Sequence, residues 1–322
     1  MMQASKGDKG MMSDQSECRS WRSVASLLGG DPHASIALLG LPLGEKSLTP
    51  GRCDLAPSVV RKALLRLSTY DLERDLSLDH LSVLDGGDLM LKAMSPAEAY
   101  QPIADRLADL AHKRDLTLVL GGNNAITRPA LAGLAKARGL GLDRVGLLTL
   151  DAHFDLRDTD CGLNNGNPVQ ALLDDGLPGS QIAQIGLQPF ANTKRMADKA
   201  RQAGIAVYPM ARVMERGLAA SIDAALAGLQ ERVDVIYVDF DIDVIARHEA
   251  PGAPGARPGG VSAHDFFAAA CQIAQHPKVA MVDLCEFDPA LDMSDITALV
   301  AARWMAEILM GYGLRHQMVT DC

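Results

Sequence analysis

The sequence predicts an α/β fold in which a central, mostly parallel sheet of eight strands lies between two layers of helices. Short apolar runs bounded by Gly, Pro or Asp recur along the chain, and many are followed by Ala- and Leu-rich stretches with helical spacing. Strands that are apolar throughout are buried on both sides, which is typical of a parallel sheet covered by helices on both faces.

Eight runs have the pattern of buried strands: 36–39, 82–84, 116–120, 145–150, 182–185, 205–208, 235–238 and 279–284. Ser95-Pro96 predicts the start of a helix with Ile103, Leu107 and Leu110 on one face. We find no repeat or linker, so residues 21–322 are expected to form one domain. Residues 1–20 are polar and aperiodic, which predicts a mobile leader.

The composition restricts the possible partners. The chain carries 31 basic and 40 acidic residues and a formal charge of −9, which opposes binding to a nucleic-acid backbone. No apolar run reaches the roughly 18 residues of a membrane span, and the first twenty residues lack the apolar centre of a secretion signal. The six cysteines include no C-x-x-C pair. We therefore expect a cytoplasmic protein whose partner is a small-molecule substrate.

Polar side chains that can bind metal follow three of the expected strands. They are Asp151, His153 and Asp155 after strand 145–150, Asp241 and Asp243 after strand 235–238, and Glu286 after strand 279–284. Parallel strands bring such residues to one edge, where the crowded negative charge needs a compensating cation. A single Asp-x-Asp is usually a solvated turn, but the joint pattern favours a metal site. An oxygen-rich set with one imidazole suits Mn²⁺, as one ion or two.

These blocks resemble those of a known family. Gly121-Gly122, Asp151-Ala-His153-Phe-Asp155, Asp241-x-Asp243 and Glu286-Phe-Asp288-Pro289 are similar to the signature blocks of the ureohydrolases, which include arginases, agmatinases and formimidoylglutamases. The resemblance covers roughly residues 34 to 310 and includes the Gly51-Arg52 loop. Residues 151–157, 185–193 and 250–252 are most similar to the formimidoylglutamase branch.

The resemblance implies a three-layer, arginase-like α/β/α fold, a two-manganese centre and a homo-oligomer, either a trimer or a hexamer. It assigns the first ion to Asp151, His153, Asp241 and Asp243, and the second to Asp151, Asp155, Asp241 and the histidine of a Gly-Gly-x-His block. Here Asn124 stands at that histidine position. An amide oxygen is a weaker donor than imidazole, so the second ion is expected to bind more loosely.

The resemblance also implies roles in catalysis. Asp155 would transfer a proton to the leaving nitrogen, and Glu286 would pair with the cationic C–N group of the substrate. Arg157 is the candidate for binding a substrate carboxylate, with a solvated surface charge as the alternative. Asn165, a further substrate-binding candidate, stands where arginases and agmatinases carry a proton-shuttling histidine; an Asn-rich turn explains it equally well.

We therefore predict a metal-dependent hydrolase of a linear amidine-type C–N bond, acting on N-formimidoyl-glutamate to give glutamate and formamide. An arginase- or agmatinase-type guanidino hydrolase is one alternative. A non-catalytic family member, acting as a binding or regulatory subunit, is the other, because of Asn124 and Asn165.

Overall fold

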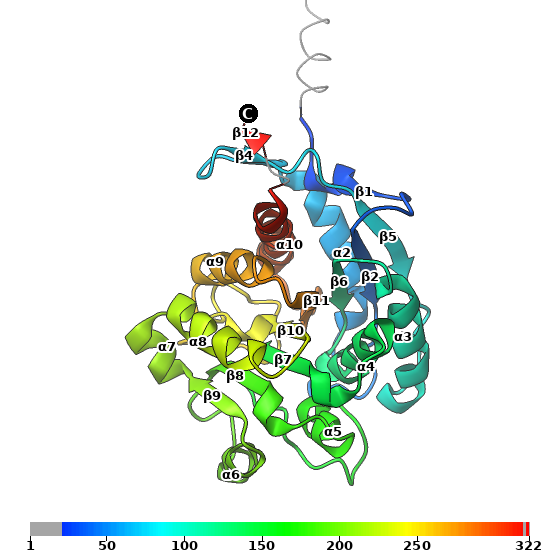
Figure 1. Ribbon diagram of the computed structural model, residues 1–322. Helices are drawn as coiled ribbons and strands as arrows, with labels where there is room; N and C mark the ends of the chain where they lie inside the picture. The colour runs from blue at the N-terminus through cyan, green and yellow to red at the C-terminus, as the bar shows by residue number, and fades with distance from the viewer. Residues whose placement is uncertain (1–20, 318–319, 322) are drawn as a thin grey trace, which may run out of the picture.

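The computed structural model describes residues 21–317 and 320–321 (Figure 1). The expected leader, residues 1–20, lies outside this range. Nine strands form one sheet in the order β1-β5-β2-β6-β11-β10-β7-β8-β9, and every pairing in it is parallel. Their bounds are β1 Leu28–Gly29, β2 Ile36–Leu41, β5 Val83–Asp88, β6 Leu116–Gly121, β7 Val145–Leu150, β8 Ile182–Leu187, β9 Ala206–Pro209, β10 Val235–Asp241 and β11 Val279–Cys285.

Helices cover both faces of this sheet, as two separate clusters of buried side chains and Figure 1 show. The first face packs against α2 Ala56–Ala63, α7 Met210–Arg216, α8 Leu218–Gln230, α9 Ala263–Ala274 and α10 Ile296–His316. The second packs against α3 Pro96–Ala111, α4 Thr127–Arg138, α5 Pro168–Asp174 and α6 Lys194–Ala203. The predicted three-layer α/β/α class is therefore confirmed.

The sheet contains all eight expected strands and one more, β1 at its edge. β1 has only two residues, so it leaves no periodic signal in the sequence. β5 continues through Asp85-Gly86-Gly87-Asp88, a segment that reads as a turn from its composition. Arg61 of α2 stabilises this strand end, since it donates hydrogen bonds to Asp85 and Asp88.

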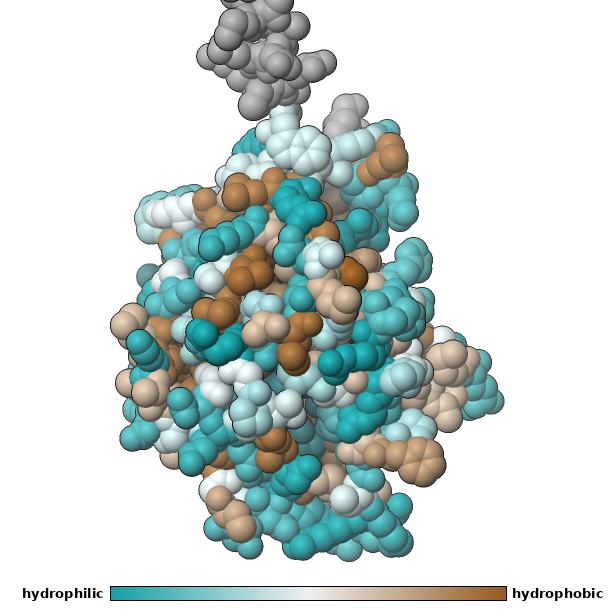
Figure 2. All heavy atoms as spheres, turned by 180° about the vertical axis from the view of Figure 1, so that it is seen from behind, coloured by the Kyte–Doolittle hydropathy of each residue, from teal (hydrophilic) through white to brown (hydrophobic). Residues whose placement is uncertain are grey.

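A smaller antiparallel sheet lies beside the main one. It joins β12 Thr320–Asp321, β4 Leu76–Ser77 and β3 Tyr70–Asp71 near the end of α10. On the face shown in Figure 2, apolar side chains are interspersed with hydrophilic ones, as on an ordinary protein surface. In the described part of the chain, no helix combines the length and the apolar composition of a membrane span.

The helices begin and end where local chemistry allows. Ser95 caps α3 through a reciprocal capping box with Glu98, and Gly139 ends α4 in the left-handed conformation.

In the core between the sheet and the helices, the ring of Phe240 of β10 packs edge-on against Phe266 and Trp304, with centroid distances of 5.6 and 5.5 Å. This packing holds the central strands, and hence their loop ends, in fixed positions.

Candidate metal and active site

The candidate residues come from four neighbouring strands in the middle of the sheet, β6, β11, β10 and β7. Each strand points its carboxyl end toward the same edge, because all the pairings are parallel. Asn124 opens the short 3₁₀-helix η4 Asn124–Ile126, Asp243 lies in η7 Ile242–Val244, and Glu286 follows β11 directly. The prediction that these loops meet at one sheet edge is confirmed.

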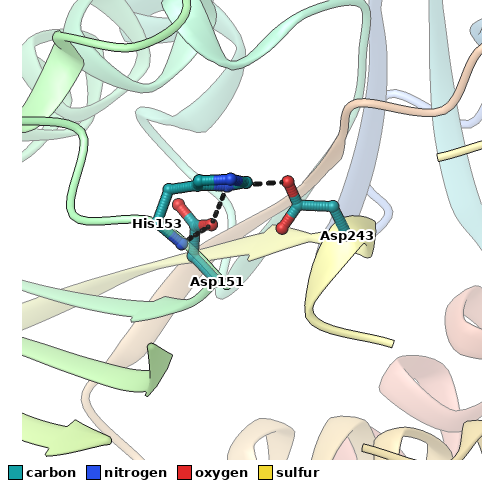
Figure 3. Close-up of side chains that lie close together, drawn as sticks. All are labelled: Asp151, His153 and Asp243. Atoms are coloured by element: carbon teal, nitrogen blue, oxygen red, sulfur yellow. Dashed lines mark hydrogen bonds and ion pairs between the residues drawn. The ribbon is translucent and has the colours of Figure 1, made fainter. Parts of the chain in front are cut away.

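His153 contacts two aspartates from different loops (Figure 3). Its Nδ1 lies 2.9 Å from Oδ2 of Asp243 and 3.4 Å from Oδ1 of Asp151. Both carboxylates are buried, while the imidazole is about one quarter exposed, at 24%. One donor atom from each residue lies within 4.8 Å of the others, so the three can share one cation.

Burial and mutual repulsion raise the pKa values of several carboxyl groups here. Burial, and then the charge of Asp243, raise the pKa of Asp151 to about 7. Burial and neighbouring carboxylates raise those of Asp155 and Asp241 well above the usual range. Asp243 is the exception, because the contact with His153 outweighs burial and lowers its pKa. A cluster that resists ionisation in this way is suited to a divalent cation, which would compensate the charge.

The neighbours of His153 favour different protonation states of its ring. Burial lowers its pKa, but Asp243 and Asp151 outweigh this and raise it to about 11. Arg257 Nη1, however, lies 2.9 Å from Nε2 of His153, and a guanidinium only donates. This contact requires an unprotonated Nε2, so its geometry is that of a neutral ring with the proton on Nδ1, facing Asp243.

Asn124 is buried beside Asp155, and its amide is fixed on both sides. Its Nδ2 donates to Oδ2 of Asp155 at 2.5 Å, while its Oδ1 accepts from Thr127 Oγ1 at 2.6 Å and from the Cys285 thiol at 3.4 Å. In this arrangement the amide nitrogen, not the oxygen, points to Asp155. Asn124 thus orients a candidate metal ligand; serving as the weak ligand itself would require the amide to turn over.

Glu286 is held by the two asparagine positions that depart from the histidines of arginases. Its Oε1 accepts from the backbone N of Asn124 at 2.7 Å and from Nδ2 of Asn165 at 3.0 Å. Burial raises the pKa of Glu286 to about 7, although these two hydrogen bonds act to lower it. Glu286 and Asp155 also have positive φ angles of 60° and 53°, a conformation that side-chain-bearing residues adopt mainly where surrounding structure imposes it.

Four of these carboxylates, those of Asp155, Asp241, Asp243 and Glu286, line a pocket of about 200 Å³. Arg157 and Asn165 line the same pocket, so both substrate-binding candidates face the metal-capable cluster. Arg157 is exposed and packs against Gly166, where an added Cβ would lie 2.8 Å from its Cδ. Asn165 fixes a loop as well, since its Oδ1 accepts from the backbone N of Leu48 at 2.8 Å.

Arg257, which no sequence motif singled out, also lines this pocket and contacts His153. The two residues are 104 positions apart, so no local motif links them. The only available signal was the Pro- and Gly-rich composition of residues 250–260, which marks an irregular loop after the Asp241-Ile-Asp243 block.

A second hollow, of about 300 Å³, lies between β3 and α10. Its buried carboxylate, Glu307, is paired with Arg303 at 2.6 Å and with the neighbouring Arg74 at 3.2 Å. The first pocket differs because its carboxylates crowd together. We therefore place the chemistry at the ends of the central strands.

Comparison with known proteins identifies the family. Residues 34–311 match the arginase family. The formimidoylglutamase of Halalkalibacterium halodurans is 34% identical over 278 residues, which are 85% of this chain and 86% of that protein. The crystal structure of Bacillus subtilis formimidoylglutamase superposes with a TM-score of 0.86 at 28% identity, covering 98% of this chain and 96% of that one.

Trypanosoma cruzi formiminoglutamase, crystallised with Mn²⁺, has the same fold, with a TM-score of 0.84 at 22% identity. The superposition covers 92% of this chain and 100% of that chain. The family match covers most of the sequence and agrees with the resemblance read from the metal-capable blocks. The chain therefore belongs to the arginase family.

Proposed function

We propose that this protein is a manganese-dependent hydrolase that converts N-formimidoyl-glutamate and water to glutamate and formamide. The observation that carries the proposal is that His153, Asp155, Asp241 and Asp243 line one small pocket, and that Asp151 is buried within reach of His153 and Asp243. The formimidoylglutamases of Halalkalibacterium halodurans and Bacillus subtilis, similar over most of this chain, support the choice of substrate.

The donor set fits manganese. It consists of hard carboxylate oxygens and one imidazole nitrogen, without a thiolate among the proposed ligands. The Trypanosoma cruzi relative was crystallised with Mn²⁺, which agrees with this choice. Asp151, His153, Asp241 and Asp243 would hold one ion. Asp155 would join Asp151 and Asp241 at a second, where Asn124 would add the weakest donor only if its amide turned to bring the oxygen toward Asp155.

Bound manganese would supply a water molecule that loses its proton near neutral pH. The residues of the chain would do the rest. Water adds to the formimino carbon, the bond from that carbon to the glutamate nitrogen breaks, and the nitrogen leaves with an added proton. We assign delivery of that proton to Asp155, because its pKa is raised and it faces the pocket.

Glu286 would bind the cationic formimino group. Its carboxylate faces the pocket and is fixed by two hydrogen bonds, which reduces the entropy lost on binding substrate. Arg157 would attract and bind a substrate carboxylate at the mouth of the pocket, where the neighbouring acidic groups would otherwise repel it. Asn165 would act through Glu286, as its hydrogen-bond partner.

A substrate panel tests the proposal. Purified protein loaded with Mn²⁺ is incubated with N-formimidoyl-glutamate, arginine and agmatine, and formamide, urea and ammonia are measured. We expect formamide from the first substrate and no urea from the others. Urea would favour a guanidino hydrolase. The third possibility, a non-catalytic binding subunit, would give no product from any substrate and no uptake of Mn²⁺, Co²⁺, Ni²⁺ or Zn²⁺.

The proposal includes a cytoplasmic location and a homo-oligomer, either a trimer or a hexamer. The oligomer rests on family resemblance and the location on the composition of the sequence. Light scattering on the purified protein tests the assembly, and fractionation of the source cells tests the location.

A further inference from the structure

Two guanidinium groups face the candidate active site without a carboxylate partner among the described residues. Both Arg157 and Arg257 line the pocket. The nearby Arg195, by contrast, pairs with Asp158 at 2.8 Å. The hydrogen bonds of the Arg257 side chain both come from Nη1, to His153 and to the carbonyl of Gly255, so within the described part of the chain its Nη2 and Nε have no partner.

The loop that carries Arg257 is held in place. Arg247 Nη1 donates to the carbonyls of Ala253 and Pro254 at 2.9 and 3.0 Å, and the Arg247 backbone N donates to the carbonyl of Arg257 at 3.1 Å. At Gly255 an added Cβ would lie 2.1 Å from Oδ2 of Asp243, so the loop lies against the metal-capable cluster. Arg257 therefore approaches this cluster from a defined position.

The contact between Arg257 and His153 depends on which ring nitrogen carries the proton. Arg257 needs Nε2 as an acceptor. A neutral ring that binds a cation through Nδ1, the nitrogen facing Asp243, must carry its proton on Nε2. Arg257 then loses its acceptor, and its guanidinium becomes available to an anion in the pocket.

We propose that Arg257 is a specificity-determining residue that binds the α-carboxylate of the substrate, while Arg157 binds the carboxylate at the other end. This inference rests on the proposed function. The α-carboxylate is attached to the carbon that bears the nitrogen of the cleaved bond, so it must lie near the metal-capable cluster. Arg257 contacts this cluster directly, through His153, whereas Arg157 is exposed at the mouth of the pocket.

Product binding tests the inference without requiring turnover. The protein loaded with Mn²⁺ is titrated by calorimetry with glutamate and with 4-aminobutyrate, which lacks the α-carboxylate. We expect Arg257→Gln to weaken glutamate binding by about tenfold or more, the loss of a charge-assisted hydrogen bond, and to change 4-aminobutyrate binding less than about twofold. Equal weakening of both ligands, or of neither, would overturn the assignment.

Two further measurements separate a specificity role from a structural one. Arg257→Gln should bind Mn²⁺ at least as tightly as the wild type, because it removes a group that competes for the ring of His153; weaker Mn²⁺ binding would overturn the inference. In turnover, the KM for N-formimidoyl-glutamate should rise about tenfold or more with little change in kcat. Arg195→Gln is the matched control, because it removes a nearby charge that is already paired with Asp158. It should change neither the affinity for Mn²⁺ nor the KM.

The inference and the proposed function can fail separately. Formamide release that does not depend on Arg257 would overturn the carboxylate assignment and leave the hydrolase intact. Glutamate binding that depends on Arg257, without any turnover, would overturn the hydrolase and leave the carboxylate subsite.

Discussion

Nη1 of Arg257 lies 2.9 Å from Nε2 of His153, while the other ring nitrogen, Nδ1, lies 2.9 Å from Oδ2 of Asp243. The two ring nitrogens therefore serve different partners, with Nδ1 facing Asp151 and Asp243. This division matters for metal binding, because the nitrogen that faces the carboxylates is the one placed to share a cation with them.

His153→Ala is expected to weaken Mn²⁺ binding by more than about tenfold, or about 1.4 kcal/mol, because it removes the only nitrogen ligand proposed for the first ion. Calorimetric titration with Mn²⁺ measures the effect. His248→Ala is the control, since His248 is exposed and lines a different hollow. Equal Mn²⁺ affinity in wild type and His153→Ala would remove His153 from the ligand set.

Asn124→His is expected to raise both the manganese content and the rate, because imidazole is a stronger donor than the amide. The structure adds a constraint: Asn124 is only 1% exposed and is oriented by Thr127 and Cys285, so the larger ring also needs space. Metal analysis and turnover are measured together, with Asn124→Ala as the matched variant that adds no ligand. No gain in either quantity would mean that the surrounding geometry has diverged as well.

Asp155→Asn should lower kcat by about 10²- to 10⁴-fold, the usual contribution of a group that transfers a proton. Metal content must be measured on the same sample, since Asp155 is also a candidate ligand. Asp158→Asn tests for a general effect on this loop, because Asp158 pairs with Lys199 instead. An unchanged kcat for Asp155→Asn would exclude the proposed proton transfer.

Stability in the presence of a chelator should fall as the pH rises. The pKa values of Asp151 and Glu286 are raised to about 7 in the folded protein, above their ordinary values of 3.8 and 4.5. Their contribution to folding is therefore fully present below about pH 4 and is lost as the pH rises through about 7. Thermal unfolding should show a lower Tm at about pH 8 than at about pH 5.5.

Added Mn²⁺ should reverse this dependence, because it binds the ionised carboxylates and stabilises the folded state by mass action. A Tm in chelator that is higher at about pH 8 than at about pH 5.5 would contradict the proposed crowding of charges.

Arg157→Ala should raise the KM for a dicarboxylic substrate about tenfold and change the KM for a neutral analogue less, because a charge-assisted hydrogen bond is lost only with the former. Steady-state kinetics with both substrates measure the difference. Arg144→Ala is a suitable control, since Arg144 precedes β7 at the opposite edge of the sheet and pairs with Asp234. Equal effects on both substrates would leave Arg157 without a role in recognition.

Much of the architecture follows from local pattern. Runs such as Val145–Leu150 are largely apolar on both faces, which is typical of buried parallel strands, so the fold class is predictable. Asp151 and His153 follow this strand, and Asp241 ends the neighbouring β10. Because ligands collect beyond the carboxyl ends of parallel strands, the sequence also predicts where these groups meet. Their individual roles stay predictions.

Other features required the tertiary structure. The two-residue strand β1 is defined by its pairing with β5, which no local periodicity could predict. The direction of the Asn124 amide is decided by Thr127, by Cys285 at the end of β11 and by Asp155 in the loop after β7. Arg257 reaches His153 from 104 residues away. Sequence alone determined which side chains stand at the ends of strands, because that depends on local periodicity; the folded chain decided which of them hydrogen-bond, because that depends on which distant loops the sheet brings together.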